Sequence, residues 1–409
     1  MFTDNAYVTI LLCSYLGVKD GNYKPYTALQ WSELGYKIIN SNIEEPANLL
    51  NMDREDIINS IKVSGEEADR IVNLLSRGEN LAFMLEEINR KGIYIITRSD
   101  KKYPQKLKSI LKKHSPPILY YCGDLSLANK TGIGIVGSRN IDDVGTNFSE
   151  QLARKAAEEG LIVFSGGAKG VDIISEKTAL NNNGYVVSIL ADSLSGKIKN
   201  KEIRDYVLSG KHLLISANNP DAPFSAASAM NRNKYIYALS NGTFVVASDY
   251  NKGGTWAGAI ENIKNQWVNT FVWNSNKYKG NIELIKKGGI PIDSVEDKSI
   301  KDLISKRIKK ENQLNIFDFD KNERIMVESE NIINENKAEY NKADYDVSNK
   351  IIDLLLNILS EPKTVDELMV LLNITKSQAT AWINRALKEG KINKINRPVR
   401  YVVNRLKQK

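Results

Sequence analysis

Short apolar runs alternate with amphipathic stretches in the middle of the chain, between residues 130 and 291. Each run has the length of a buried strand, and stretches with helical periodicity, such as 147–159, separate them. Strands that alternate with helices are typical of βαβ units, and nearly continuous apolar strands fit a parallel sheet covered on both faces. The predicted strands are 133–136, 161–164, 185–190, 212–216, 243–247 and 270–273.

Three other zones flank this α/β pattern and predict four parts in the chain. Residues 1–95 carry helical periodicities and predict a helical N-terminal domain, which the α/β domain at 96–291 follows. Residues 292–346 are rich in Asp, Glu, Asn and Lys, so they predict a charged flexible linker, within which 300–308 keeps a helical pattern. Residues 347–409 are periodic again and predict a further domain.

The last zone has the pattern of a winged helix. Thr364 with Glu367 three residues later forms a capping box, and Gly390 suits a helix end. Two extended stretches then surround Asn396-Arg-Pro398, as the strands of a wing would. The predicted helices are 348–360, 364–373 and 375–388.

Charge makes this last zone a candidate for binding nucleic acid. The 409 residues include 57 Lys and Arg against 49 Asp and Glu, a net charge of +8, and residues 347–409 carry twelve against five, or +7. Such a concentration is the footprint of nucleic-acid binding, and a recognition helix would enter the major groove of duplex DNA. An alternative is a winged helix that binds a partner protein. The candidate contacts are Lys376, Gln378, Thr380 and Arg385 on the third helix, with Arg397 and Arg400 on the wing.

Glycines stand where predicted strands of the α/β domain end and helices begin. They occur at Gly137, at Gly166-Gly167 and at Gly253-Gly254. Glycine lets a ligand approach the backbone closely, and free N–H groups at a helix start attract phosphate. In an open parallel sheet these loops share the carboxyl edge, where ligands bind. Three such loops favour a binding crevice over the alternative that each glycine only permits a tight turn.

Cationic side chains accompany these loops. Arg139 follows the first, Lys169 lies inside the second, and Lys252 precedes the third. Arg232 and Lys234 lie on or before a helical stretch. Phosphate-rich ligands require such donors. We interpret Arg139, Lys169 and Arg232 as site residues, and Lys252 as part of a solvated surface.

The motifs around these loops resemble those of the DprA/Smf family of DNA-processing proteins. The similarity covers about 100–291, and it rests on the motifs together, since none is specific alone. The principal matches are Ile135-Val-Gly-Ser-Arg139, Ser165-Gly-Gly-Ala-Lys-Gly-Val-Asp172, Arg232-Asn-Lys234, Gly253-Gly-Thr255 and Gly288-Gly-Ile-Pro291.

The resemblance implies an extended Rossmann-like, doubly wound and mostly parallel fold that binds single-stranded DNA as a homodimer. It also implies a role in DNA recombination, with loading of a RecA-type recombinase in natural transformation, or in a branch that serves phage defence or mobile elements. The family's helical N-terminal domain and C-terminal winged helix fit the two ends of this chain. The phosphate-binding residues would be Gly137, Ser138, Arg139, Ser165, Gly166, Gly167, Lys169, Arg232, Lys234, Gly253, Gly254 and Thr255.

The chain departs from the family at several of these positions. Lys169 stands where the family usually has Arg, Glu176 where it usually has His, and Lys234 where it usually has the second Arg of Arg-Asn-Arg. Asp172 and Glu176, four residues apart, are either a carboxylate pair for acid–base chemistry or a helix-start anion and an ion-pair partner. The alternatives to a DNA mediator are therefore a nucleotide-sensing or nucleotide-hydrolysing Rossmann-like protein, or a regulatory adaptor that acts through the winged helix.

One segment of the predicted linker resembles the pentapeptide by which many bacterial proteins dock on the replicative sliding clamp. Its candidate contacts are Gln313, Leu314, Ile316 and Phe317. A five-residue match also arises by chance, so the clamp is one of two interpretations.

Composition excludes several other classes of protein. Two cysteines, Cys13 and Cys122, are too few for a disulfide scaffold or a cysteine-based zinc site. The two histidines have no metal-ligand spacing, and the sequence has neither a Gly-x-Ser-x-Gly elbow nor a full Walker A motif. No apolar run is long enough to span a bilayer, and the apolar stretch 7–16 lacks the flanks of a signal peptide. We expect a cytoplasmic, non-enzymatic protein without catalytic residues, metal or cofactor.

Overall fold

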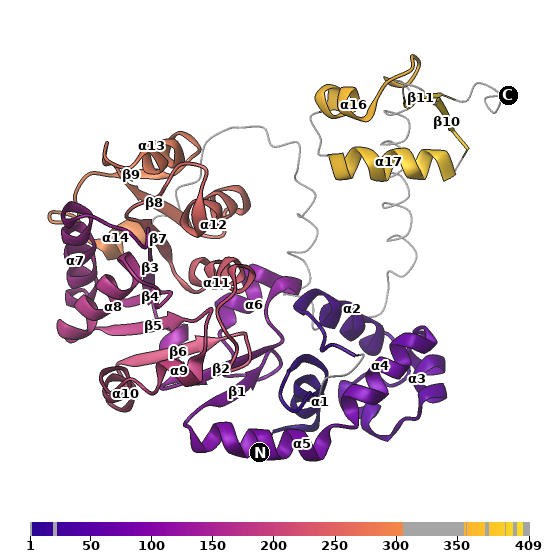
Figure 1. The fold of residues 1–409 in the computed structure, drawn as a ribbon, viewed down its shortest axis with the longest axis horizontal. Coiled ribbons are helices and arrows are strands. Elements are labelled where there is room, and N and C mark those ends of the chain that lie inside the picture. Colours follow the sequence, from indigo (N-terminus) through magenta and orange to yellow (C-terminus); the bar gives the residue numbers. More distant parts are fainter. Residues whose placement is uncertain are drawn as a thin grey trace. The chain divides into compact units, whose positions relative to one another are not determined.

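The chain forms two compact units, Met1–Lys310 and Glu311–Lys409, each with its own hydrophobic core. Figure 1 shows the fold as a computed structural model. The residues that the structure describes are 2–18, 23–305, 356, 358–372, 376–388, 390–395 and 399–403.

A large mostly parallel sheet, as predicted, forms the centre of the first unit. Its described strands number nine, in the order β1-β2-β6-β5-β4-β3-β7-β8-β9. Strands β3 to β9 run parallel, whereas β2 pairs antiparallel with both β1 and β6. The strands are β1 Tyr94–Thr97, β2 Ile118–Cys122, β3 Gly132–Val136, β4 Ile162–Ser165, β5 Tyr185–Ile189, β6 His212–Ser216, β7 Gly242–Val245, β8 Asn269–Trp273 and β9 Ile290–Ile292.

Helices cover both faces of this sheet, which explains why its strands are apolar at nearly every position. Along β3, Ile135 packs in the core beneath α7 and α8, whereas its neighbour Val136 packs in the core beneath α11 and α12. The same alternation places Val163 and Phe164 of β4 in different cores. The covering helices include α6 Gln105–Leu111, α7 Asp143–Glu158, α8 Val171–Asn181, α9 Leu194–Lys197, α10 Lys201–Leu208, α11 Ala226–Leu239, α12 Gly253–Asn265 and α13 Lys279–Lys286, with the 3-10 turns Lys112–His114 and Leu125–Asn129.

The N-terminal residues are helical and pack against the β1–β2 end of the sheet (Figure 1). The core of these helices includes Ile95 of β1, Ile118 of β2 and Leu214 of β6. The apolar stretch 7–16 falls largely in α1, and no helix in the described parts of the chain is long and apolar enough to cross a membrane. The elements are α1 Asp4–Cys13, α2 Ala28–Ile39, a 3-10 turn Pro46–Asn51, α3 Arg54–Ile61, α4 Gly65–Leu75 and α5 Gly78–Arg90.

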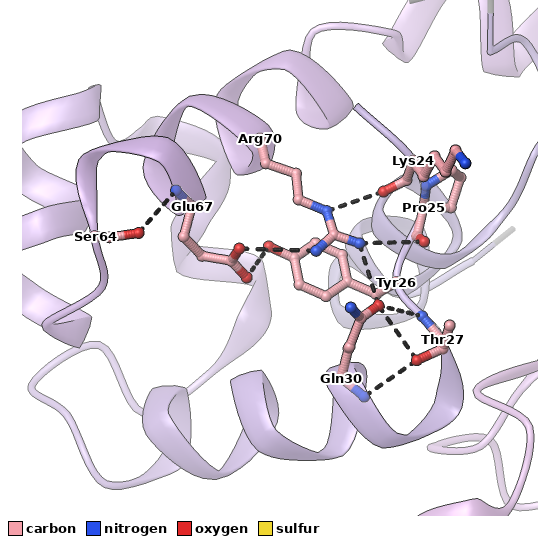
Figure 2. A network of polar contacts seen from close by, with 8 residues as sticks. All are labelled: Lys24, Pro25, Tyr26, Thr27, Gln30, Ser64, Glu67 and Arg70. Carbon is pink, nitrogen blue, oxygen red and sulfur yellow. Dashed lines mark hydrogen bonds and ion pairs between the residues drawn. The ribbon is translucent and has the colours of Figure 1, made fainter. Parts of the chain in front are cut away.

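A polar network fixes the extended segment before α2 to helix α4 (Figure 2). The guanidinium of Arg70 lies 3.8 Å from the ring centre of Tyr26 and donates hydrogen bonds to the carbonyl oxygens of Lys24 and Pro25. The Tyr26 hydroxyl donates to Glu67 at 2.7 Å. Burial, reinforced by this carboxylate, raises the pKa of Tyr26. The segment is therefore held by side chains where it has no strand or helix of its own.

The first unit continues beyond β9 into residues that composition assigned to the linker. Val295 and Ile300 are buried in the core under α7. Helix α14, Ile300–Ser305, starts against Glu159, whose carboxylate accepts from the backbone N–H groups of Ile300 and Lys301 at 2.9 and 2.8 Å. A negative charge at a helix start is favourable. Residues 293–305 thus pack on the first unit. The helical pattern at 300–308 predicted α14 as far as the described residues extend, but not that the helix would pack against this core.

The described residues of the second unit are two helices and a hairpin. Helix α16 is Val365–Leu372, α17 is Lys376–Lys388, and β10 Ile392–Ile395 pairs antiparallel with β11 Arg400–Val403. The capping box forms, because the Thr364 hydroxyl accepts from the Glu367 N–H and the Glu367 carboxylate accepts from the Thr364 N–H. Leu359, Leu368, Ile383, Ala386 and Ile392 make the core.

Candidate nucleic-acid interface

The order of the strands creates a crevice between β3 and β7. The chain proceeds from β3 through β4 and β5 to β6 on one side, and then returns to place β7 on the other side of β3. A crevice at the carboxyl edge is the usual binding site of such a doubly wound sheet. The Ser138 N–H donates to the Ala247 carbonyl at 2.9 Å, which joins the loops after β3 and β7 at this point.

A pocket of about 810 Å³ opens at this crevice, and we call it the loop pocket. Its walls come from the loops after β3 and β7, from the ends of α11 and α12, and from the loop before α11. The second glycine loop contributes Ala168, while Ser165, Gly166, Gly167, Lys169 and Lys234 are not among the walls. The predicted site residues that line it are Gly137, Ser138, Arg139, Arg232, Gly253, Gly254 and Thr255.

The first two glycine loops are in backbone contact at Gly170. This residue has φ +80°, a conformation that side chains rarely adopt. A Cβ atom here would lie 2.3 Å from the carbonyl oxygen of Ser138 and 2.6 Å from that of Arg139. Only glycine therefore allows the start of α8 to approach the loop that carries Arg139.

Arg232 of α11 reaches the second glycine loop and is buried there, with 6% of its surface exposed. Its Nη1 atom lies 3.4 Å from a carboxylate oxygen of Asp172 and 3.3 Å from the Ile189 carbonyl oxygen. A Cβ atom at Gly166 would fall 1.0 Å from the same Nη1, so the guanidinium occupies the space that this glycine leaves. The sequence interpretation gave Arg232 to a ligand phosphate. The structure gives it an internal carboxylate, and the phosphate contact stays a prediction.

The other predicted cations differ in how accessible they are. Arg139, Lys169 and Lys252 are exposed on the glycine loops. Lys234, by contrast, is half-buried and forms an ion pair of 3.0 Å with Glu261 of α12. Arg139 and Lys252 line the loop pocket, whereas Lys169 lies on the second glycine loop outside its walls. All three are accessible to a phosphate chain that crosses the loops.

Exposed aromatic and apolar side chains border the loop pocket, a feature that the sequence analysis missed. The guanidinium of Arg139 lies 4.9 Å from the ring centre of Phe224, which is 49% exposed. Met230 and Tyr250 are also exposed there, and Tyr250 contacts the buried Trp256 edge to face. An apolar side chain within the Pro- and Asn-rich segment before α11 was the available signal for Phe224. Large rings on an exposed loop are suited to stacking against a ligand.

The two carboxylates of α8 are both buried beneath the second glycine loop. Burial raises the pKa of Asp172, which Arg232 opposes. Glu176 accepts from the Gly167 N–H at 2.8 Å. Burial, and then the charge of Asp172, raise the pKa of Glu176 to about 7. Both carboxyl groups therefore make contacts inside the protein, Asp172 with Arg232 and Glu176 with the second glycine loop. Asp172 is the ion-pair partner that one of the two sequence interpretations describes.

The raised pKa of Glu176 makes stability depend on pH. Between its usual value of 4.5 and about 7, the folded chain holds a proton at Glu176 that the unfolded chain has released. The free energy of unfolding is therefore expected to fall as pH rises through this window, by about 3 kcal/mol in total. Urea unfolding at a series of pH values measures this, and Glu176→Gln should flatten the slope. Some slope should remain, because the pKa of Asp172 is raised as well.

The matched control is Glu158→Gln, the same change at an exposed position on α7. It should unfold with the pH dependence of the unaltered protein. A Glu176→Gln protein with the same slope as this control would show that Glu176 is ionised in the fold.

The remaining predicted residues fall in the second unit or outside the described residues. Lys376, Gln378, Thr380 and Arg385 lie on α17, where Thr380 is exposed, and Arg400 is exposed at the start of β11. Arg397 and the clamp-like segment at 313–317 lie outside the described residues. Among the residues described, no three His, Cys, Asp or Glu side chains gather as a metal site.

A doubly wound α/β unit with glycine loops gathered at its switch point is a Rossmann-like protein with the features of an anion-binding site. The profile of the family described as DNA recombination-mediator protein A matches residues 94–303, half of this chain. The chain belongs to that family, and the resemblance seen in the motifs is confirmed.

Individual relatives agree with this assignment. The DNA processing protein DprA of Bacillus subtilis (strain 168) is 29% identical over 222 residues, which are 52% of this chain and 73% of that protein. Protein Smf of Escherichia coli (strain K12) is 26% identical over 208 residues, 50% of this chain and 55% of that protein. The X-ray structure of DprA from Streptococcus pneumoniae superposes with a TM-score of 0.56 at 20% identity, over 72% of this chain and 96% of that chain, which supports the fold.

Proposed function

We propose that this protein binds single-stranded DNA across the loop pocket and acts as a recombination mediator. The observation that carries the proposal is the exposed pair of Arg139 and Phe224 beside three glycine loops at the switch point. Membership of the DNA recombination-mediator family supports the same function.

Two kinds of contact would hold the strand. The guanidinium of Arg139, the ammonium of Lys169 and the backbone N–H groups of the loops would bind phosphates, which requires no particular sequence. The ring of Phe224 would stack with a base that faces the protein. Stacking of this kind tolerates every base, because each has a π face. The strand would thus be bound through features that all single-stranded sequences share.

Further partners follow from the resemblance and from the second unit. We propose that the two helices and the hairpin form a winged helix whose α17 and β11 contact duplex DNA, since residues 347–409 carry most of the net charge. A homodimer, a RecA-type recombinase and a sliding clamp at 313–317 remain proposals on the motifs alone. The domain limits 1–95, 96–291, 292–346 and 347–409 are proposed on the same ground, with the correction that 293–305 pack on the first unit and are not part of a linker.

Removing one cation from the loops should weaken DNA binding without regard to sequence. Arg139→Ala and Lys169→Ala are each expected to lower the affinity for labelled single-stranded oligonucleotides and to reduce the salt slope by about one. Fluorescence anisotropy at several salt concentrations measures both quantities. Phe224→Ala should also weaken binding, by about 1–3 kcal/mol, but leave the salt slope unchanged.

Arg154→Ala is the control for lost charge, because Arg154 is exposed on α7 away from the loop pocket. Its affinity should match that of the unaltered protein. If Arg139→Ala and Lys169→Ala both bind as this control does, the loop pocket does not hold the strand. Displacement of the oligonucleotide by a free mononucleotide would instead favour the nucleotide-sensing alternative.

A further inference from the structure

A second pocket, of about 470 Å³, lies where the N-terminal helices meet the carboxyl edge of the sheet, and we call it the tyrosine pocket. Its walls come from the segments after α1 and before α2, from the start of β2, from the loop after β6 and from α11. Its size falls within the usual range of ligand sites. The wall residues that offer a ring or an amide group include Tyr15, Tyr26, Pro116, Asn218, Asn231 and Tyr235.

Helix α11 separates the tyrosine pocket from the loop pocket, and it packs between α6 and α12 (Figure 1). Its residues on the side of the tyrosine pocket, spaced three and four apart as on one helix face, are Ser228, Asn231 and Tyr235. Those on the side of the loop pocket include Ala229, Met230 and Asn233. Arg232 lines both pockets, so the two adjoin. A helix is about 10–12 Å across, which about three nucleotides of a stacked strand would span.

The walls of the tyrosine pocket suit a neutral, flat and polar group. Among the residues described, these walls hold no Asp, Glu, Lys or His, and their one charged side chain, Arg232, is paired with Asp172. The side-chain amides of Asn218 and Asn231 form no hydrogen bond within the described residues, so each can donate to a ligand and accept from it. Tyr15 is 54% exposed and offers its ring for stacking. A nucleobase combines these properties, because it has a flat face and an edge that donates and accepts.

One wall of the tyrosine pocket is held in place by the polar network of Figure 2. Pro25, Tyr26 and Thr27 belong to this wall and precede α2. Arg70 donates to the Pro25 carbonyl oxygen at 3.2 Å and covers the Tyr26 ring, while the Gln30 side chain accepts from the Thr27 N–H at 3.1 Å. A wall that is ordered before the ligand arrives lowers the entropy cost of binding. The network thus prepares the pocket for a ligand.

Cations suited to phosphates lie in the segment that leads to the Pro116 wall. Residues 98–113 carry seven Lys and Arg against one Asp, the charge that a polyanion requires. Lys112 and Lys113 are exposed in the 3-10 turn just before this wall, and Lys113 has no ion pair among the described residues. The Lys113 carbonyl oxygen accepts from the Ser32 hydroxyl at 3.0 Å, which fixes the turn against α2.

We propose that the tyrosine pocket is a second base-binding site for single-stranded DNA, which continues to it from the loop pocket across α11. One base would stack on Tyr15 and hydrogen bond to Asn218 or Asn231, and the adjacent phosphates would meet Lys113. The inference rests on the proposed function, because the strand also occupies the loop pocket. It implies a minimum length: a strand of three nucleotides fills one pocket, whereas one of about six or more reaches both.

Isothermal titration calorimetry of the full chain with unlabelled dT3 and dT12 tests the proposal, because a dye could itself stack on the exposed rings. Tyr15→Ala is expected to weaken dT12 about tenfold and to leave dT3 unchanged. Tyr15→Phe keeps the ring and should bind both as the unaltered protein does. Lys113→Ala should also weaken dT12 alone and reduce its salt slope by about one. The control for lost charge is Lys264→Ala, an exposed position on α12 outside both pockets, and it should change neither affinity.

The results distinguish a failure of this inference from a failure of the proposed function. If Arg139→Ala and Lys169→Ala weaken dT12 but Tyr15→Ala and Lys113→Ala do not, the strand occupies the loop pocket alone, and only the inference is overturned. It is also overturned if Tyr15→Ala weakens dT3 as much as dT12. If the unaltered protein binds no oligonucleotide, the proposed function fails and the inference fails with it. Unfolding temperatures show that each variant folds.

Discussion

Arg232→Met is expected to lower the free energy of unfolding by about 3 kcal/mol at neutral pH. The substitution keeps much of the apolar stem but removes the guanidinium from Asp172, a carboxylate that is 7% exposed. Asp172 must then lose its charge or remain buried without a partner. Urea unfolding measures the loss. The deficit should narrow as pH falls, because protonation of Asp172 removes the unpaired charge.

A neighbouring ion pair provides the control for this substitution. Lys234→Met removes the partner of Glu261, but both side chains of that pair are about one-third exposed, so the loss should be below about 1 kcal/mol. Arg232→Met combined with Asp172→Asn should recover part of the stability, because no charge is then left alone. If Arg232→Met and Lys234→Met lower the free energy of unfolding equally, the prediction is wrong. Water must then solvate the Asp172 carboxylate once the guanidinium is gone.

Gly170→Ala is expected to have a similarly large effect, about 3 kcal/mol, for two separate reasons. Alanine at φ +80° is strained, which alone costs about 1 kcal/mol or more. Its Cβ would also collide with the Ser138 carbonyl oxygen, which is backbone and cannot rotate away. Relief requires the first two glycine loops to separate. We therefore expect both a lower free energy of unfolding and weaker binding of single-stranded DNA, the latter as part of the proposed function.

Gly210→Ala isolates the strain from the collision. Gly210 has φ +74°, and a Cβ atom there would meet nothing within 4 Å. Gly210→Ala should therefore lower the free energy of unfolding only by the backbone strain, about 1 kcal/mol. Equal decreases in the free energy of unfolding for Gly170→Ala and Gly210→Ala would contradict this prediction. They would show that the loops after β3 and β4 can separate at no energetic cost, so the close contact at Gly170 does not contribute to stability.

The central strands could be predicted because each is determined by its own residues. Strands β3 to β8 are short apolar runs that separate amphipathic helices, and burial on both faces leaves that pattern in the sequence. Strands β1 and β2 were not predicted. The antiparallel position of β2 depends on pairing with β6, about a hundred residues away in the chain, and β1 joins the sheet only through β2. The hydrophobic pattern of a short segment does not indicate which distant strand it pairs with.

The glycines located the candidate site, but the geometry of its side chains could not be predicted. Arg139 is exposed and Arg232 is buried, although both are arginines next to family motifs. The difference depends on Asp172, which approaches Arg232 from sixty residues away. Glu176 likewise acquires its raised pKa from burial under Gly167. The burial of Arg232 and the raised pKa of Glu176 arise only when distant elements pack together. They therefore cannot be predicted from the sequence alone.

The space shared by Gly166 and Arg232 also constrains how this chain can evolve. Any side chain at position 166 would occupy the place of the guanidinium, so a long cation at 232 and a substituted residue at 166 exclude each other. A lineage can enlarge residue 166 only after residue 232 has become shorter. Each intermediate along that route leaves Asp172 without its cation, unless the aspartate has changed first. The three positions are therefore expected to change together, in a fixed order, or not at all.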